Sequence, residues 1–332
     1  MADDHYHEDS VFTDSPALDA GESRSAEPRA QRPVVEQLDE ESMPETQPTQ
    51  QAAIAKPELS SAVPLRPPVI VLGMHRSGTS AMAGALCRLG GWVGEDKELL
   101  PANAANPSGY FEREETKATL DQMLAAVRGT WSNPPHESLS LYKLESVRPA
   151  LAALVAKLVA RVPDAQFLVM KDPRLSLFSV LLSPLIPNAT LVVCVRHPLA
   201  VARSLMARDH TNLLHALAMW EAYNVALCQG LEGRELFVWD FDESKRDRLP
   251  GFLGEVLCNE VRLTPVELGL GDHVHQHVTS EDEEQWLTLG QLRLWHRLRE
   301  LADGQQPTRL SHWELSAASM QILDPVRHAV VR

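Results

Sequence analysis

The amino-acid sequence predicts an α/β fold, a parallel sheet flanked by helices, preceded by a disordered acidic tail. Short apolar runs alternate along the chain with longer segments of helical periodicity, which is typical of strand–helix–strand units. The runs are apolar on both faces, as expected for parallel strands that are covered by helices on each side. The acidic side chains gather at the N-terminus, away from these elements.

The predicted tail spans residues 1–63. The first 60 residues hold 14 acidic and 4 basic side chains, whereas the other 272 hold 31 and 27. A segment this polar buries too little apolar surface to offset the entropy of ordering, so we expect it to be disordered. It could serve as a solubilising leader or carry a docking motif. We expect one domain over 64–303 and a C-terminal extension of uncertain structure over 304–332.

The elements of the domain follow from periodicity and from local breaks in it. Four apolar runs predict strands, joined by crossovers that should be right-handed. The predicted strands are Val69–Leu72, Gln166–Met170, Thr190–Val195 and Glu235–Trp239. The predicted helices are Ser80–Leu89, Glu112–Val127, Leu144–Arg161, Leu199–Ala207, Asn212–Gln229, Asp247–Cys258 and Glu281–Asp303.

Composition argues against several classes of protein. Beyond the tail the charge is nearly balanced, which leaves no strongly basic face for nucleic acid. No run of about 18 apolar residues predicts a membrane span, and the acidic N-terminus is unlike a secretory signal. The four cysteines form no CxxC pair and are expected to be reduced. These features together predict a cytoplasmic protein.

The segment after the first strand carries the strongest functional signal. Gly73 and Gly78 bracket four residues and lead into a helix, which is the frame of a phosphate-binding loop. Backbone N–H groups at such a helix start are unpaired and lie at its positive end. Thr79 stands where a nucleoside triphosphatase has lysine, and the positive charge is Arg76 instead. This difference points to a donor other than a nucleoside triphosphate.

Three segments resemble the sulfotransferases that use 3′-phosphoadenosine 5′-phosphosulfate (PAPS). The first, Gly73-Met-His-Arg-Ser-Gly-Thr-Ser80, is similar to their 5′-phosphosulfate loop. The second combines Lys171-Asp-Pro with a strand that ends in Arg196 and a helix that carries Ser204. The third, Asn106-Pro-Ser-Gly-Tyr-Phe-Glu112, resembles a segment of bacterial members. The resemblance covers roughly residues 67–245 and implies the P-loop-like sulfotransferase architecture.

The resemblance implies a set of site residues. It places the 5′-phosphosulfate on the loop and the 3′-phosphate on Arg196 and Ser204. It assigns Lys171, at the carboxyl end of a strand, to stabilising the leaving phosphate. The implied loop contacts are Gly73, Arg76, Ser77, Gly78, Thr79 and Ser80. The hydroxyls of Thr79 and Ser80 could also cap the helix, a role that is compatible with phosphate binding.

A base must also take the proton of the acceptor as it attacks sulfur. Glu112 is the leading candidate, although it could simply favour the positive end of a helix. Asp172 is the alternative, and His75 is a further possibility within the loop. His273, His275 and His277 alternate as zinc ligands can, but no cysteine or fourth histidine accompanies them, so no metal site is predicted.

The function predicted is therefore in-line transfer of a sulfuryl group from PAPS, without a metal, to a hydroxyl or amine. A P-loop kinase or other phosphotransferase is one alternative, and a sulfotransferase-like nucleotide-binding module without activity is another. The acceptor could be a saccharide, a lipid headgroup, a peptide tyrosine or a phenol. The sequence does not choose among them.

Overall fold

The computed structural model describes residues 66–103, 106–135, 141–164, 166–270 and 281–323, which all belong to one compact unit. The predicted tail over 1–63 lies outside the described residues. The histidine stretch His273, His275 and His277 lies outside them as well.

The described residues form a six-stranded sheet in the order β2-β3-β1-β4-β5-β6. The strands are β1 (Val69–Leu72), β2 (Gly91–Trp92), β3 (Phe167–Lys171), β4 (Thr190–Val195), β5 (Glu235–Asp240) and β6 (Thr308–Arg309). All neighbours are parallel except β5 and β6, which are antiparallel. The parallel sheet expected from the sequence is confirmed. Strand β1 lies between β3 and β4, so the segments after these three strands meet at one edge.

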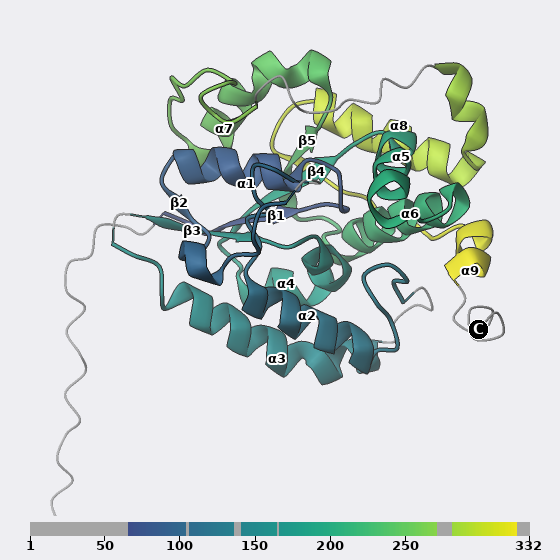
Figure 1. Ribbon diagram of the computed structural model, residues 1–332, viewed down its shortest axis with the longest axis horizontal. Coiled ribbons are helices and arrows are strands. Elements are labelled where there is room, and N and C mark those ends of the chain that lie inside the picture. The colour runs from purple at the N-terminus through teal and green to yellow at the C-terminus, as the bar shows by residue number, and fades with distance from the viewer. Residues whose placement is uncertain (1–65, 104–105, 136–140, 165, 271–280, 324–332) are drawn as a thin grey trace, which may run out of the picture. The chain divides into compact units, whose positions relative to one another are not determined.

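Helices cover both faces of this sheet (Figure 1). The described α-helices are α1 (Thr79–Arg88), α2 (Glu114–Ala126), α3 (Leu141–Val159), α4 (Ser179–Leu185), α5 (Pro198–Asp209), α6 (Leu213–Gly230), α7 (Leu249–Leu257), α8 (Leu289–Asp303) and α9 (Ala317–Leu323). Alternate residues of β1 explain the two layers. Val69 and Val71 pack in one apolar cluster with α1 and α7, and Ile70 and Leu72 pack in the other, with α2, α3, α4 and α6.

One long predicted helix is interrupted in the structure. The expected helix over Glu281–Asp303 is a 3₁₀ turn at Glu281–Trp286 followed by α8. The break has a clear cause at Thr288, whose side chain accepts from the N–H of Gln291 while the Gln291 side chain accepts from the N–H of Thr288. This reciprocal capping box fixes the start of α8.

The chain after residue 303 closes the same unit. Strand β6 pairs with β5, and α9 packs against α6. The fully buried carboxylate of Glu221 on α6 accepts hydrogen bonds from the N–H and hydroxyl of Ser316 and from the hydroxyl of Ser319, at 2.6–2.9 Å. These elements were not predicted from the sequence, because each is short.

Candidate active site

The loop after β1 approaches two neighbours so closely that only glycine fits. Gly73 has φ 140° and Gly78 has φ 86°, both in the left-handed half of the map. A Cβ at Gly73 would lie 2.4 Å from the carbonyl oxygen of Cys194, and one at Gly78 would lie 2.3 Å from the Phe241 ring. The loop is therefore pressed between the end of β4 and the segment after β5.

The N-terminus of α1 is left without a side-chain cap. Gly78 is the N-cap residue, and within the described part of the chain it makes no side-chain cap hydrogen bond. The alternative in which Thr79 or Ser80 caps the helix is therefore wrong, because the helix already begins at Thr79. Ser77 and Thr79 are both buried in the loop, and the Ser77 N–H donates to the carbonyl of Met74 at 3.2 Å. Free first-turn N–H groups at this end suit an anion.

Arg76, Arg196 and Ser204 meet on one side of the loop. Arg76 has φ 69°, and its Nε donates to the hydroxyl of Ser204, on α5, at 2.7 Å. Arg196, directly after β4, donates from Nη1 to the carbonyl of Arg76 at 3.1 Å. Its guanidinium also lies 5.7 Å from the centre of the Phe241 ring. The structure thus brings together residues that are 120 and more positions apart in the sequence.

These two arginines create a positive, partly dehydrated surface. Burial and the neighbouring Arg76 charge lower the pKa of Arg196 to about 10, against the opposite pull of Asp242 and Asp240. Burial and the charge of Arg208 lower the pKa of Arg76. A bound anion would stabilise the charged form of cations whose pKa values are lowered in this way. The residues present therefore fit a phosphate or sulfate group.

Lys171 and Glu112 form a buried ion pair beside the start of α1. Lys171 ends β3, and its Nζ lies 2.5 Å from Glu112 Oε1, 3.0 Å from the Ser80 hydroxyl and 2.9 Å from the carbonyl of Tyr110. Glu112 precedes α2 by two residues, and both side chains of the pair are at least 94% buried. Ser80 therefore connects the phosphate loop to this pair.

A second acidic group lies behind the pair. Asp172 is fully buried, and its carboxylate accepts from Arg174 Nη1 at 3.0 and 3.1 Å and from the Arg174 N–H at 2.9 Å. Burial, and then the charge of Glu112, raises the pKa of Asp172 to about 6. Arg174 also lies 2.8 Å from Asp121 and 3.7 Å from Glu112. Both carboxylates that the sequence offers as bases are thus held by cations.

His75, in the same loop, packs against two aromatic rings. Its ring is 4.9 Å from that of Trp131 and 5.7 Å from that of Tyr223, measured between centres. Its Nε2 is buried and has no hydrogen-bond partner among the described residues. Leaving such a buried polar atom unpaired costs about 1–3 kcal/mol.

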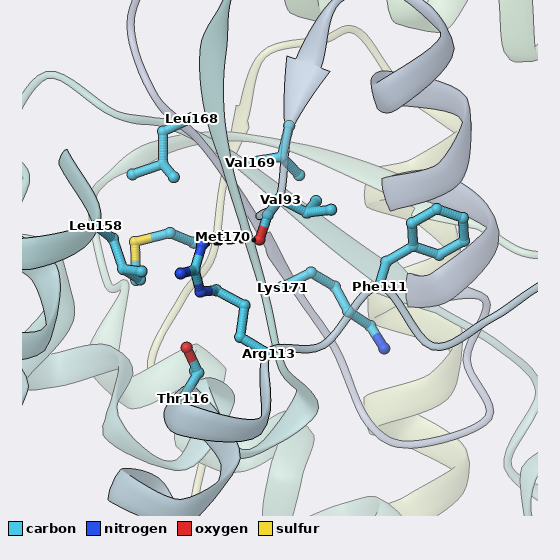
Figure 2. A pocket seen from close by; sticks show the side chains of 9 residues that line it. All are labelled: Val93, Phe111, Arg113, Thr116, Leu158, Leu168, Val169, Met170 and Lys171. Carbon is cyan, nitrogen blue, oxygen red and sulfur yellow. Dashed lines mark hydrogen bonds between the residues drawn. The ribbon is translucent and has the colours of Figure 1, made fainter. Parts of the chain in front are cut away.

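A small cavity lies behind Lys171, lined by Val93, Phe111, Arg113, Thr116, Leu158, Leu168, Val169, Met170 and Lys171 (Figure 2). Its volume is about 10 Å³. Arg113 Nε and Thr116 Oγ1 are buried there without partners in the described part of the chain. Figure 2 shows the ammonium of Lys171 turned away from both. The cavity suits about one water molecule and is too small for a substrate.

Sequence reasoning missed several residues that support the site. Arg174 directly follows the Lys171-Asp-Pro motif but was given no role, although it joins Asp172, Asp121 and Glu112. Asn106 donates to Ser80 at 3.3 Å from a motif that was singled out only for its glutamate. Phe241, directly after β5, packs on the loop at Gly78. Such contacts cross between distant segments and leave no local signal.

Among the residues whose positions are described, we find no group of three or more His, Cys, Asp or Glu side chains able to hold a metal. Within the same ranges, no helix has both the length and the apolar character needed to cross a bilayer.

Comparison with known proteins identifies the family. Residues 67–230 match the model of the sulfotransferase family. The chain is similar in structure to a sulfotransferase domain from the Synechococcus PCC 7002 olefin synthase, at 17% identity over 79% of this chain and 96% of that one, with a TM-score of 0.37. It is also similar to a sulfotransferase domain from the curacin biosynthetic pathway, at 14% identity over 79% and 98%, with a TM-score of 0.36. No curated protein matches. Residues 67–230, which contain the phosphate loop, Lys171 and Arg196, therefore belong to the sulfotransferase family.

Proposed function

We propose that this protein transfers a sulfuryl group from PAPS to a hydroxyl or amine acceptor. The observation that carries the proposal is that two arginines lie at a phosphate-binding loop shaped by glycines. The loop lacks the lysine that a nucleoside triphosphatase has there. Gly73 and Gly78 shape the loop, and the Arg76 side chain bonds to Ser204 while Arg196 bonds to the Arg76 backbone. Family membership supports the same reaction class.

The donor site follows from these contacts. The 5′-phosphosulfate binds at the start of α1, to the loop backbone and to the side chains of Arg76, Ser77, Thr79 and Ser80. The 3′-phosphate binds to Arg196 and Ser204, since a guanidinium and a hydroxyl can both donate to phosphate oxygens. The Arg76–Ser204 hydrogen bond supports two phosphate sites that are neighbours.

The chemistry is a single in-line displacement. The acceptor oxygen forms a bond to sulfur as the bond from sulfur to the bridging oxygen breaks. Arg76 and Lys171 offset the negative charge that develops on the bridging oxygen. Lys171 is already directed to the start of α1 through Ser80. In this proposal the protein's own cations supply the charge, and no metal takes part.

The role of Glu112 as the base stays a prediction. Its carboxylate is bonded to Lys171 and lies 3.7 Å from Arg174. To accept a proton it must release Lys171, whereas in the present arrangement it fixes the position of that ammonium. The cytoplasmic location and the acceptor class also stay predictions.

The experiment that tests the proposal follows ³⁵S-labelled PAPS. We expect the label to bind to the wild type, to be displaced by 3′,5′-diphosphoadenosine and to resist displacement by ATP with Mg²⁺. Arg76→Ala should slow loss of the label from the donor at least about 100-fold, because one donor to the developing charge is worth that much. Arg262→Ala, at an exposed ion pair with Glu260, is the matched control.

Three results would each redirect the assignment. Displacement by ATP with Mg²⁺ and not by the diphosphate would favour a phosphotransferase. Donor binding without turnover on saccharide, lipid, tyrosine peptide or phenol would favour a binding module. A normal rate in Arg76→Ala would remove Arg76 from the mechanism.

A further inference from the structure

The ammonium of Lys171 already has three acceptors, one for each of its N–H bonds. Its Nζ lies 2.5 Å from Glu112 Oε1, 3.0 Å from the Ser80 hydroxyl and 2.9 Å from the Tyr110 carbonyl. In the proposed function this ammonium also donates to the bridging oxygen of PAPS. It must therefore withdraw from at least one of its three acceptors during the reaction.

The three acceptors differ in what they lose when Lys171 withdraws. The Ser80 hydroxyl donates to the Tyr110 carbonyl at 3.2 Å and accepts from Asn106 Nδ2 at 3.3 Å. These two groups are neutral, and each keeps a hydrogen-bond partner. The Glu112 side chain is 6% exposed, and a buried carboxylate without a counter-charge is strongly destabilised. Glu112 is therefore the acceptor that needs a second cation.

Arg174 is placed to be this second cation. Its Nη1 lies 3.7 Å from Glu112 Oε2, whereas Lys171 binds the other oxygen, Oε1. The Arg174 guanidinium is itself fixed, because Nη1 donates to both oxygens of Asp172 and Nε lies 2.8 Å from Asp121 on α2. Arg174 thus contacts Glu112 through the oxygen that Lys171 does not use and can hold it when Lys171 withdraws.

Arg174 also balances the charge of this buried cluster. Lys171 and Arg174 face the carboxylates of Glu112 and Asp172. The two carboxylates repel each other, since burial and then the charge of Glu112 raise the pKa of Asp172 to about 6. Without Arg174, both would depend on Lys171 as their buried cation and would hold its ammonium away from the bridging oxygen.

We propose that Arg174 is a positioning residue of the sulfuryl transfer, which holds Glu112 in place while Lys171 turns towards the leaving oxygen. This role rests on the proposed function, which places Lys171 at that oxygen. Arg174 acts through Glu112 and Lys171 and needs no contact with the donor or the acceptor. Because its effect arises as charge develops on the leaving oxygen, it changes the rate of transfer and not the affinity for the donor.

The test compares Arg174→Gln, Glu112→Gln and the double variant in the full chain, by the loss of label from saturating ³⁵S-PAPS to water. Arg174→Gln should slow this loss about 10- to 100-fold, because a misplaced catalytic group costs about that much. Calorimetry should find its affinity for 3′,5′-diphosphoadenosine within about threefold of the wild type. In the Glu112→Gln background the same substitution should change the rate by less than about threefold, because the carboxylate through which Arg174 acts is gone.

Two further variants separate positioning from a loss of stability. Ser316→Ala/Ser319→Ala removes buried hydrogen bonds of Glu221 and should lower stability without changing the rate. Arg174→Lys keeps a buried cation and serves where Arg174→Gln does not fold. It loses the planar fork that faces both carboxylates, so it should slow the loss of label about fivefold or more.

Several outcomes would overturn the positioning role. Equal rate factors for Arg174→Gln in the two backgrounds do so, as does a rate within about threefold of the wild type in the folded Arg174 variants. A loss of diphosphate affinity as large as the loss of rate assigns Arg174 to donor binding instead. An equally slow Ser316→Ala/Ser319→Ala variant attributes the effect to stability. Failure of the wild type to bind the diphosphate or to release the label overturns the proposed function itself, before any variant is measured.

Discussion

At the scale of single residues, Lys171 and Glu112 dominate the energetics of the site. Each side chain is almost completely buried, so removing one leaves an uncompensated charge in the interior. Glu112→Ala should therefore lower the free energy of unfolding by about 3–5 kcal/mol. Glu115→Ala breaks the exposed pair with Lys157 and should cost less than about 1 kcal/mol. Urea denaturation of both variants measures the difference, and equal losses would contradict a buried pair.

Gly78 offers a second test at this scale, because the chain contains a matched control. Gly78 and Gly90 have nearly the same φ, 86° and 92°, but only a Cβ at Gly78 meets another group, the Phe241 ring. Gly90→Ala measures the left-handed strain alone, about 1–2 kcal/mol. Gly78→Ala adds the overlap and should lose more stability, and Phe241→Ala should recover part of that extra loss.

Equal losses in Gly78→Ala and Gly90→Ala would show that Phe241 moves aside without cost. Thermal denaturation of the two single variants and of the Gly78→Ala/Phe241→Ala double variant measures both terms.

The site residues also show what sequence can and cannot predict. Gly73, Gly78 and Arg76 follow each other in a motif, so their common loop could be read from local spacing. Contacts such as Arg174 with Asp121 join segments 53 positions apart and depend on how β3 and α2 pack. The orphan nitrogen of His75 is likewise a property of packing, since Trp131 and Tyr223 come from distant segments.

At the scale of elements, α5 begins with an unusual titratable cap. His197 is the N-cap residue, and its neutral Nδ1 accepts from the N–H of Leu199 at 3.3 Å. Burial lowers its pKa to about 4 despite the nearby carboxylate of Glu284. The unfolded state then binds a proton more readily, so this contribution to stability is complete above about pH 6.5 and is lost as the pH falls towards 4.

His197→Asn keeps a cap acceptor but cannot titrate in this range. The wild type should therefore lose stability relative to this variant as the pH falls from 7 to 5, by less than about 1.4 kcal/mol per unit. The raised pKa of Asp172 makes stability depend on pH in the opposite direction. Because Asp172 is present in both proteins, this contribution to the free energy of unfolding cancels in the comparison. Urea denaturation at several pH values measures this, and parallel pH curves would contradict the assignment.

Elements with strong periodicity were predicted well, and their ends less so. Strands β1 and β4 match their predicted ranges, because a buried parallel strand is marked by an uninterrupted apolar run. The single helix expected over Glu281–Asp303 is two elements in the structure. The prediction merged them because the apolar stripe continues across the capping box at Thr288. A local capping motif there outweighs the periodicity.

At the scale of the whole unit, the last described helix is held to the core through one buried carboxylate. Ser316 and Ser319 satisfy Glu221, and the core around it includes Leu323, which is fully buried. The Ser316→Ala/Ser319→Ala double variant leaves that carboxylate short of donors. It should lower the free energy of unfolding by about 3 kcal/mol or more, at roughly 1.5–3 kcal/mol for each charged hydrogen bond.

Ser244→Ala is the control for this prediction, because its hydroxyl also bonds to a carboxylate, that of Asp242, but in solvent. It should change stability by less than about 1 kcal/mol. Guanidinium denaturation compares the two. A double variant as stable as Ser244→Ala would show that these two buried hydrogen bonds contribute no more than an exposed one.

The arrangement of the whole unit explains why its site could be located from sequence. In a parallel sheet with β1 between β3 and β4, the loop after β1, Lys171 and Arg196 must lie at one edge. Topology thus brings together three motifs that the sequence keeps apart. The position of the loop that contains Trp131, by contrast, is not encoded by any periodicity.

The most direct measurement is titration calorimetry of the wild type and Arg196→Ala with 3′,5′-diphosphoadenosine and with ATP plus Mg²⁺. The account predicts tight binding of the diphosphate and weak binding of ATP. It also predicts an about 10- to 100-fold loss of diphosphate affinity in Arg196→Ala, as expected for one charge-assisted contact. Preference for ATP with Mg²⁺, or diphosphate binding that is unchanged in Arg196→Ala, would contradict it.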